Sequence, residues 1–242
     1  MKPDFITEVD WKLLQEKYKE NIEEIVKKLE SHYPVQYLIG NVEFLNIVIE
    51  VDERVLIPRF ETELLVAKTI EKIKKMSLQK PKILDLGTGS GCIAIALKKN
   101  INADVTGVDI SDKALEVAKK NALLNQVEIQ FINADMKEVS YTGYDVIISN
   151  PPYVKETEPV GEETKFEPQN ALFAKNDGLY FYEQILKKVS ELSTKPKLIV
   201  FEIGMSQKEE IKKLINKYLS TSKTETEKDL AHKDRYIFIE CE

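Results

Sequence analysis

The sequence of 242 residues has few of the residues that build metal centres or disulfide frameworks. Its two cysteines, Cys92 and Cys241, and its two histidines, His32 and His232, have no partners at metal-ligand spacing. We therefore expect reduced cysteines and no metal cofactor. No run of about 18 apolar residues occurs, as a membrane span would require. The N-terminal segment also lacks the apolar core of a signal peptide, so we expect a cytoplasmic protein.

The chain has no excess of positive charge, with 35 Lys and Arg residues against 41 Asp and Glu residues. The formal net charge is −6, which disfavours the broad basic face that nonspecific binding to nucleic acid requires. The length suits one large domain, or one domain with a small appendage.

The most informative stretch runs from Lys82 to Leu97 and reads KILDLGTGSGCIAIAL. It predicts a buried strand (82–86), a glycine loop (87–91) and a helix that begins at Cys92. Such a loop lets a ligand lie against the main chain at a helix N-terminus. The spacing is G-x-G-x-G, which differs from the dinucleotide pattern G-x-G-x-x-G.

Two carboxylates flank this loop. Asp85 precedes the glycines, and Asp109 ends the next strand-like run, where a carboxylate can accept both hydroxyls of a ribose. We interpret the stretch as a nucleoside-binding loop. The alternative, a tight turn with nothing bound, leaves both carboxylates unexplained.

The hydrophobic pattern predicts an N-terminal part with three elements. One amphipathic helix is expected from Asp10 to Ser31, and an extended segment with a turn at Gly40-Asn41 from Val35 to Ile57. A further helix begins at Glu61 or Thr62, and its inner face carries Val66, Ile70 and Ile73.

Beyond Lys82, strands alternate with helices, which predicts a parallel, doubly wound α/β sheet that binds ligands at the carboxyl ends of its strands. Ser111 is expected to cap one helix, and Ser206 with Glu209 to form a capping box before another. The further strands are expected at 127–132, 144–149, 197–203 and 235–240, and the further helices at 111–125, 179–192 and around 211–218.

A second motif, Asn150-Pro151-Pro152-Tyr153, directly follows the strand that ends at Ser149. Proline restricts both its own backbone and the residue before it, so Asn150 and the Pro151 carbonyl can act as two rigid acceptors. Tyr153 offers a flat face to a planar group. A proline-rich turn without a ligand is the alternative interpretation.

Two such acceptors suit the two hydrogens of an NH₂ group. A conjugated NH₂ is a poor nucleophile, and paired acceptors would aim the lone pair of its nitrogen. If the nucleoside in the glycine loop carries a methylsulfonium group, the reaction is an in-line methyl transfer, in which positioning supplies most of the catalysis.

DLGTGSG, Asp109 and NPPY together resemble a class I S-adenosylmethionine-dependent methyltransferase. Other segments resemble the peptide chain release factor glutamine methyltransferases (the HemK/PrmC family) from about Pro34 to the C-terminus: PVQYLIG, VLIPRFETELLV, DISDKALEVAKKNALLN, FEPQNALFAKNDGLYFYEQI, FEIGMSQ and KDLAHKDRYIF. The resemblance implies a Rossmann-like fold and methylation of the glutamine of the Gly-Gly-Gln motif in class I release factors, with S-adenosylhomocysteine as the other product. We expect a helical arm (1–33), a β-hairpin linker (34–58) and a methyltransferase domain (59–242).

The resemblance also implies the site. Catalysis is assigned to Asn150 and Pro151, and substrate binding to Asn150, Pro151, Pro152 and Tyr153. The implied cofactor-binding residues are Asp85, Gly87, Thr88, Gly89, Ser90, Gly91, Asp109, Ile110, Asp135, Met136 and Asn150. Arg59, Glu61 and Thr62 match a family segment that borders the site, without individual roles.

Two departures from the family pattern stand out. Met136 occupies a position that is often aromatic, which puts stacking on adenine in question there. About 33 residues precede Pro34, fewer than the family usually carries, so we expect a reduced or differently arranged contact with the release factor.

Three rival functions remain open at this point. An adenine-N6 DNA methyltransferase also uses NPPY, but it needs a recognition region and a basic channel that this sequence lacks. A non-catalytic binding protein predicts a degraded motif, whereas both motifs are intact. A nicotinamide dehydrogenase predicts a different glycine spacing. For the glutamate-rich loop from Glu156 to Glu167, a solvated loop is favoured over a contact with a basic partner.

Overall fold

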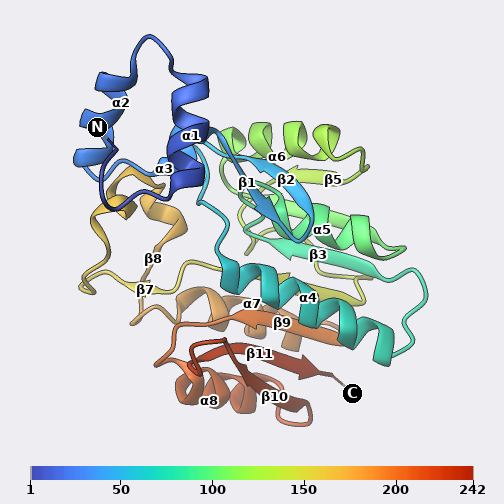
Figure 1. Cartoon of the computed structure of the whole chain (residues 1–242). Coiled ribbons are helices and arrows are strands. Elements are labelled where there is room, and N and C mark those ends of the chain that lie inside the picture. Colours follow the sequence, from blue (N-terminus) through green and yellow to red (C-terminus); the bar gives the residue numbers. More distant parts are fainter. Residues whose placement is uncertain (1, 242) are drawn as a thin grey trace.

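A seven-stranded, mostly parallel sheet lies at the centre of the computed structural model, which describes residues 2–241 (Figure 1). Its strand order is β10-β11-β9-β6-β3-β4-β5. The five strands from β9 to β5 are parallel, and β11 and β10 add antiparallel pairs beyond β9. This topology confirms the predicted doubly wound α/β class. The strands are β3 (Lys82–Leu86), β4 (Asp104–Asp109), β5 (Gln130–Asn133), β6 (Val146–Ser149), β9 (Leu198–Glu202), β10 (Lys223–Lys228) and β11 (Asp234–Glu240).

Helices cover both faces of the sheet, so its central strands β3, β6 and β9 are apolar on both sides. On one face lie α4 (Phe60–Lys75), α5 (Cys92–Asn100) and α6 (Asp112–Leu124); on the other lie α7 (Tyr180–Ser190) and α8 (Lys208–Tyr218). Successive residues of one strand enter different cores, as Ile83 and Leu84 do. The Ser111 hydroxyl accepts a hydrogen bond from the Ala114 N–H and caps α6, which confirms that prediction.

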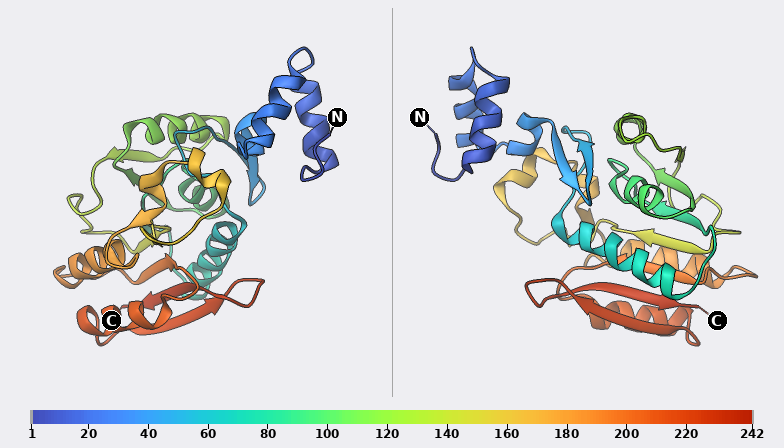
Figure 2. Two further views of the ribbon diagram at one scale, coloured as in Figure 1. Left: turned by 90° about the vertical axis from the view of Figure 1, so that its left-hand side faces the viewer. Right: turned by 45° about the vertical axis from the view of Figure 1, so that its right-hand side comes forward.

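The N-terminal arm consists of two helices, so the prediction of one helix from Asp10 to Ser31 is wrong. The chain turns between α1 (Glu8–Lys17) and α2 (Ile22–Glu30), and the arm projects from one end of the molecule (Figure 2). The physical reason is burial: Leu14, Ile25 and Leu29 pack together in a small core. A straight helix would leave this stripe exposed to water.

The segment after the arm also differs from the prediction. Val35–Ile39 forms a short helix, α3, which ends at Gly40 with a φ of 94°. The hairpin follows as β1 (Asn41–Phe44) and β2 (Ile47–Glu50), so its turn lies at residues 45–46 and not at Gly40-Asn41. Local β propensity suggested an extended chain. Burial of Tyr37 and Leu38 overrides that propensity.

The hairpin is fastened to the main domain by Asn121 of α6. The Asn121 side chain is fully buried; its oxygen accepts the N–H of Glu50, and its nitrogen donates to the carbonyls of Glu50 and Ser90. One amide thus ties the hairpin, α6 and the glycine loop together.

Two further predictions fail near the C-terminus. Ser206 and Glu209 form no capping box, because α8 is preceded by Gln207, whose side-chain oxygen accepts the Gly204 N–H. Strand β10 was not predicted from the sequence. It reads KTETEK, and charged residues are common on edge strands that have no apolar partner on their outer side.

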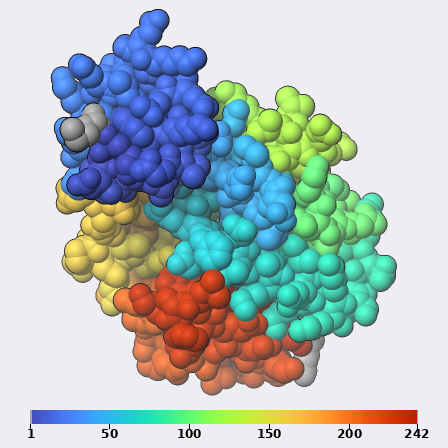
Figure 3. All heavy atoms as spheres, viewed as in Figure 1, coloured from blue at the N-terminus to red at the C-terminus, as the bar shows by residue number. Residues whose placement is uncertain are grey.

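The loop after β6 carries short elements that approach the arm: β7 (Val154–Lys155), β8 (Phe173–Ala174) and the 3₁₀ helices η1 (Glu162–Phe166) and η2 (Gln169–Ala171). The ring of Phe166 lies edge-on to that of Tyr33, with centroids 5.0 Å apart. Figure 3 shows this gold-coloured segment beside the blue N-terminal lobe. The glutamates of this loop are exposed except Glu167, which is buried. Among residues 2–241, we find no helix with the length and apolar character needed to cross a bilayer.

Gly91 offers a test of close packing in the glycine loop. Its φ is 82°, and an added Cβ would lie 3.1 Å from the Cβ of Ala118. Gly143 has nearly the same φ, 83°, but nothing lies within 4 Å of its Cβ position. We expect Gly143→Ala to cost about 1 kcal/mol through backbone strain alone. Gly91→Ala should cost roughly 1–3 kcal/mol more because of crowding. Urea unfolding of both variants measures the difference, and equal costs would contradict the packing argument.

Candidate functional site

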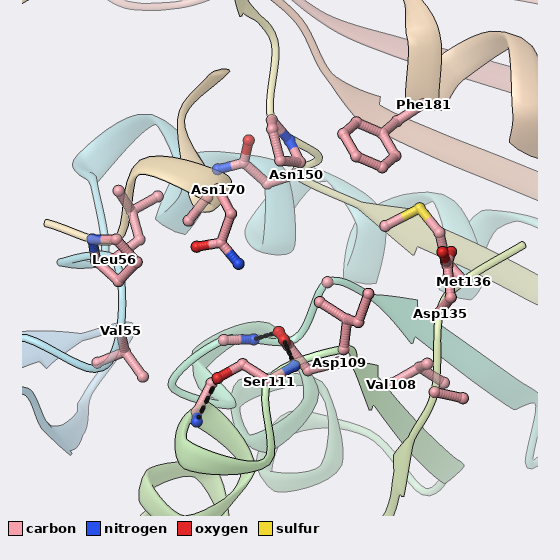
Figure 4. Close-up of a pocket in the computed structure, with 18 of the residues that line it drawn as sticks. Val55, Leu56, Val108, Asp109, Ser111, Asp135, Met136, Asn150, Asn170 and Phe181 are labelled. Carbon is pink, nitrogen blue, oxygen red and sulfur yellow. Dashed lines mark hydrogen bonds between the residues drawn. The ribbon is translucent and has the colours of Figure 1, made fainter. Parts of the chain in front are cut away.

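The carboxyl ends of β3, β4 and β6 surround a cavity of about 310 Å³, which is within the size range of ligand sites. Its walls come from several segments: the hairpin linker, the glycine loop, the ends of β4 and β5, the NPPY loop, η2 and the start of α7. In Figure 4, Asp109 and Ser111 lie opposite Asn150 and Asn170, while Met136 and Phe181 form a third side. The two sequence motifs therefore face one space, as the parallel topology predicted.

The glycine loop is held rigidly at the bottom of this cavity. The N–H groups of Gly87 and Thr88 both donate to the carbonyl of Val108. The Thr88 hydroxyl donates to the carboxylate of Asp85 at 2.6 Å. Gly89 has a φ of 54°, and its Cβ position has no atom within 4 Å. The missing side chain leaves open space at the cavity wall, which is the fit that a ligand lying against the main chain requires.

Asp109 presents an oriented carboxylate to the cavity. One of its oxygens accepts the Gly89 N–H at 2.8 Å, and the other accepts the Ser111 N–H at 2.9 Å. Burial raises the pKa of Asp109, and these backbone N–H groups act against that shift. Each oxygen keeps a free lone pair, so the group can accept two neighbouring hydroxyls at once.

The third side of the cavity is apolar. The side chains of Met136 and Phe181 approach one another there, and the exposed Ile110 and the ring of Pro152 add to the lining. The Met136 methyl carbon lies 3.7 Å from the position of a Gly87 Cβ. Phe181 was missed by the sequence reasoning, because it enters the site only when α7 packs over the sheet. An aromatic ring thus stands beside Met136 on this wall.

Asn150 is held by a chain of side-chain hydrogen bonds. Its amide nitrogen donates to the Thr62 hydroxyl at 3.0 Å, and this hydroxyl donates to the Glu202 carboxylate at 2.7 Å. Thr62 and Glu202 are buried, with 3% and 1% of their surfaces exposed. Burial raises the pKa of Glu202 to about 7, against the hydrogen bond from Thr62 and the charge of Arg235. This arrangement gives Thr62 a role that the sequence left open.

A second, smaller cavity of about 50 Å³ lies on the other side of Asn150. Asn150, Leu56 and Ala171 line both cavities. The remaining lining residues of the smaller cavity are Arg59, Pro151, Tyr153, Val154, Leu172 and Glu202. Asn150 therefore stands where two spaces meet, one large and one suited to a short side chain.

Tyr153 is fixed in the wall of the small cavity by its backbone and by its hydroxyl. Its carbonyl accepts the side-chain N–H of Gln207 at 2.9 Å, and its hydroxyl lies 3.4 Å from the Glu202 carboxylate. Burial raises the pKa of the Tyr153 hydroxyl. Gly178 lies so close that an added Cβ would be 2.0 Å from the Tyr153 carbonyl oxygen. Gln207 and Gly178 thus set the position of the NPPY loop.

Arg59 links the small cavity to a third space of about 340 Å³, between the arm and the main domain. Its guanidinium pairs with Glu167, whose side chain is fully buried. The second carboxylate oxygen of Glu167 accepts the Ile57 N–H at 3.1 Å. Glu167 therefore joins the hairpin linker to the loop that carries η2.

Comparison with known proteins identifies the family. The chain is 41% identical to the release factor glutamine methyltransferase of Flavobacterium psychrophilum over 225 residues, which cover 90% of this chain and 79% of the relative. It is 38% identical to the enzyme of the same name from Lactococcus lactis over 238 residues, or 97% and 84% of the two chains.

The chain belongs to the release factor glutamine methyltransferase family.

Two further comparisons agree with a methyltransferase fold. Residues 61–173 match the methyltransferase small domain. Among solved structures, the hMettl16 catalytic domain in complex with an RNA hairpin superposes with a TM-score of 0.65 at 16% identity, covering 81% of this chain and 76% of that one. The fold is thus that of class I methyltransferases, as the resemblance implied.

Within this release factor glutamine methyltransferase fold, the predicted site residues fall into three groups. Those at the wall of the large cavity are Gly87, Gly89, Asp109, Ile110, Asp135, Met136, Asn150 and Pro152. Pro151 and Tyr153 line the small cavity instead. Asp85, Thr88, Ser90 and Gly91 line neither cavity and are buried, Asp85 at the end of β3 and the other three within the glycine loop. Their predicted contact with a cofactor stays a prediction; their observed contacts support the loop.

Both cysteines are free thiols, Cys92 buried and Cys241 half-buried, as expected. Among residues 2–241, no three His, Cys, Asp or Glu side chains gather closely enough to hold a metal ion.

Asp85 generates a prediction about stability and pH. It is fully buried, one of its oxygens has no hydrogen-bond partner within residues 2–241, and burial raises its pKa to about 7. Because the folded-state pKa lies above the unfolded value, this carboxyl stabilises the fold fully below about pH 4 and loses that contribution as pH rises from there through 7. Between pH 6 and pH 8, the free energy of unfolding should fall by about 1 kcal/mol more in the wild type than in Asp85→Asn.

Urea unfolding at the two pH values, without cofactor, measures this difference. A gap between wild type and Asp85→Asn that is the same at pH 6 and pH 8 would show that Asp85 does not titrate in this range.

Proposed function

We propose that this protein transfers a methyl group from S-adenosylmethionine to the side-chain amide nitrogen of the glutamine in the Gly-Gly-Gln motif of class I peptide chain release factors. The observation that carries the proposal is the position of Asn150 between a nucleoside-sized cavity and a small one. The names of the relatives support the same substrate.

The large cavity fits the cofactor. Asp109 would accept both ribose hydroxyls, and the open space above Gly89 would receive the methionine part. Met136 and Phe181 would contact the adenine ring from the apolar wall. When bound, the cofactor supplies an electrophilic methyl group on a positively charged sulfur.

The small cavity would receive the glutamine side chain. The Asn150 side-chain oxygen and the Pro151 carbonyl would each accept one hydrogen of its NH₂ group, which turns the lone pair of the nitrogen towards the large cavity. The fixed prolines and the Gln207 contact hold these acceptors before the substrate arrives, so little reorganisation is needed. The methylated amide nitrogen carries positive charge and is strongly acidic, so its proton can pass to water after the methyl transfer.

The size of the small cavity favours glutamine over adenine. About 50 Å³ corresponds to a few water-sized spheres, which suits a carboxamide better than a flipped purine. The net charge of −6 points away from DNA in the same way.

A single mass measurement tests reaction, substrate and cofactor together. Incubation of the protein with S-adenosylmethionine and a purified class I release factor should add the mass of one CH₂ group to the Gly-Gly-Gln peptide, as seen by mass spectrometry. A release factor with glutamate in place of that glutamine is the control and should gain nothing. Methyl incorporation into DNA but not into the release factor would overturn the proposal.

Substitutions at the two motifs should separate cofactor binding from methyl transfer. Asn150→Ala removes one acceptor at the reacting nitrogen, so kcat should fall roughly 10²–10³-fold with little change in cofactor Kd. Asp109→Ala removes a charged acceptor of two hydroxyls, so cofactor Kd should rise roughly 10–100-fold. Calorimetry and single-turnover assays measure the two effects. Normal turnover by Asn150→Ala would refute the amide clamp.

A further inference from the structure

Glu202 is a buried carboxylate without an obvious structural purpose. It ends β9, only 1% of its surface is exposed, and its side-chain donors within residues 2–241 are the hydroxyls of Thr62 and Tyr153. An ionised carboxylate in such a place costs free energy of folding unless it is paired. Glu202 lines the small cavity, as do Asn150 and Tyr153. Thr62 does not line it, but its hydroxyl joins Glu202 to Asn150.

When Glu202 is ionised it can only accept, and this determines the direction of the hydrogen bonds in the chain from Glu202 to Asn150. A threonine hydroxyl has one hydrogen, and that of Thr62 is donated to the carboxylate of Glu202. Towards Asn150, Thr62 can therefore only accept, and only the amide nitrogen of Asn150 can donate. The side-chain oxygen of Asn150 must then point away from Thr62.

We propose that Thr62 and Glu202 form a positioning relay, which holds the Asn150 amide with its nitrogen on Thr62 and its oxygen free to accept a hydrogen from the substrate. This role rests on the proposed function, in which the substrate presents an NH₂ group. An inverted Asn150 amide would place its own NH₂ against that group, and two donors cannot form the hydrogen bond. Within residues 2–241, no hydrogen bond occupies the Asn150 side-chain oxygen, which is also not among the buried, unpartnered atoms.

The relay joins elements that are distant in sequence. Thr62 lies in the first turn of α4, Asn150 directly follows β6, and Glu202 is the last residue of β9. The Glu202 backbone is fixed as well, since its carbonyl accepts the hydroxyl of Tyr182 at 2.7 Å. Neither Thr62 nor Glu202 lines the large cavity, so loss of the relay should leave cofactor binding unchanged.

Thr62→Val tests the relay because it removes the hydroxyl and keeps the shape of the side chain. Thr69→Val is the matched control: Thr69 is fully buried on the same helix, and within residues 2–241 its hydroxyl bonds only to the Leu65 carbonyl. Thr62→Ser restores the hydroxyl. We expect the single-turnover rate of methyl transfer to fall at least about tenfold in Thr62→Val. It should stay within about threefold of the wild type in Thr62→Ser and Thr69→Val, with cofactor Kd unchanged in all three.

Glu202→Gln tests whether the carboxylate acts through Thr62. Glutamine can turn its NH₂ towards Thr62, which would free the threonine hydrogen for Asn150 and invert the amide. The rate should fall in Glu202→Gln, and the double variant with Thr62→Val should be little slower than the slower single variant. Two independent contributions would instead multiply, and that result would overturn the relay, as would a wild-type rate in Thr62→Val or Glu202→Gln.

A spectroscopic measurement separates the relay from the proposed function. In protein labelled with ¹⁵N-asparagine and free of cofactor, the NH₂ signals of Asn150, assigned through Asn150→Ala, report its bond to Thr62. They should move in Thr62→Val and stay in place in Thr69→Val; unmoved signals in Thr62→Val refute the relay. A wild-type enzyme that methylates no release factor refutes the proposed function, while these signals still decide whether Thr62 orients Asn150.

Discussion

Parallel pairing of β3 with β6 brings together two motifs that are far apart in sequence. Leu86, at the end of β3, pairs with Ser149, at the end of β6, and the Ser149 hydroxyl donates to the Leu86 carbonyl at 2.6 Å. Directly beyond these residues the chain leaves the sheet as the glycine loop on one side and as NPPY on the other. A slip of this register would carry Asn150 away from the glycine loop, so the site depends on it.

Much of the central domain could be predicted from the sequence, because short buried strands, glycine turns and helix caps are local signals. Strand β3 and the cap at Ser111 are examples. The prediction failed where burial outweighs local preference. Val35–Ile39 has β-prone residues and forms a helix, and the arm folds back on itself to cover its own apolar stripe. Strand β10 has no apolar pattern, because it lies at the edge of the sheet, where it pairs with β11.

Some residues of the candidate site could likewise be predicted from the sequence, and others could not. Asp109, Asn150 and the glycines follow strands directly, so topology alone places them at one edge of the sheet. Phe181, Thr62 and Glu202 come from α7, α4 and β9, and nothing in their spacing links them to the motifs. Packing of α7 and α4 on the two faces of the sheet brings Phe181 to the large cavity and Thr62 to Asn150. Glu202 lies near Asn150 because β9 pairs with β6, with Phe201 opposite Ser149. Resemblance to a family indicated that the segment around Thr62 borders the site, but its hydrogen bonds required the structure.

Glu167 has a consequence for the thermodynamics of binding. The loop from η1 to η2 forms part of the wall of both cavities, and a free loop of that kind would have to be ordered when ligands arrive. Here the ordering cost is met during folding: Glu167 is bonded to Arg59 and Ile57, and Phe166 packs on Tyr33 of the arm. The wall is therefore preorganised, and the conformational entropy lost on binding falls mainly on the incoming ligands.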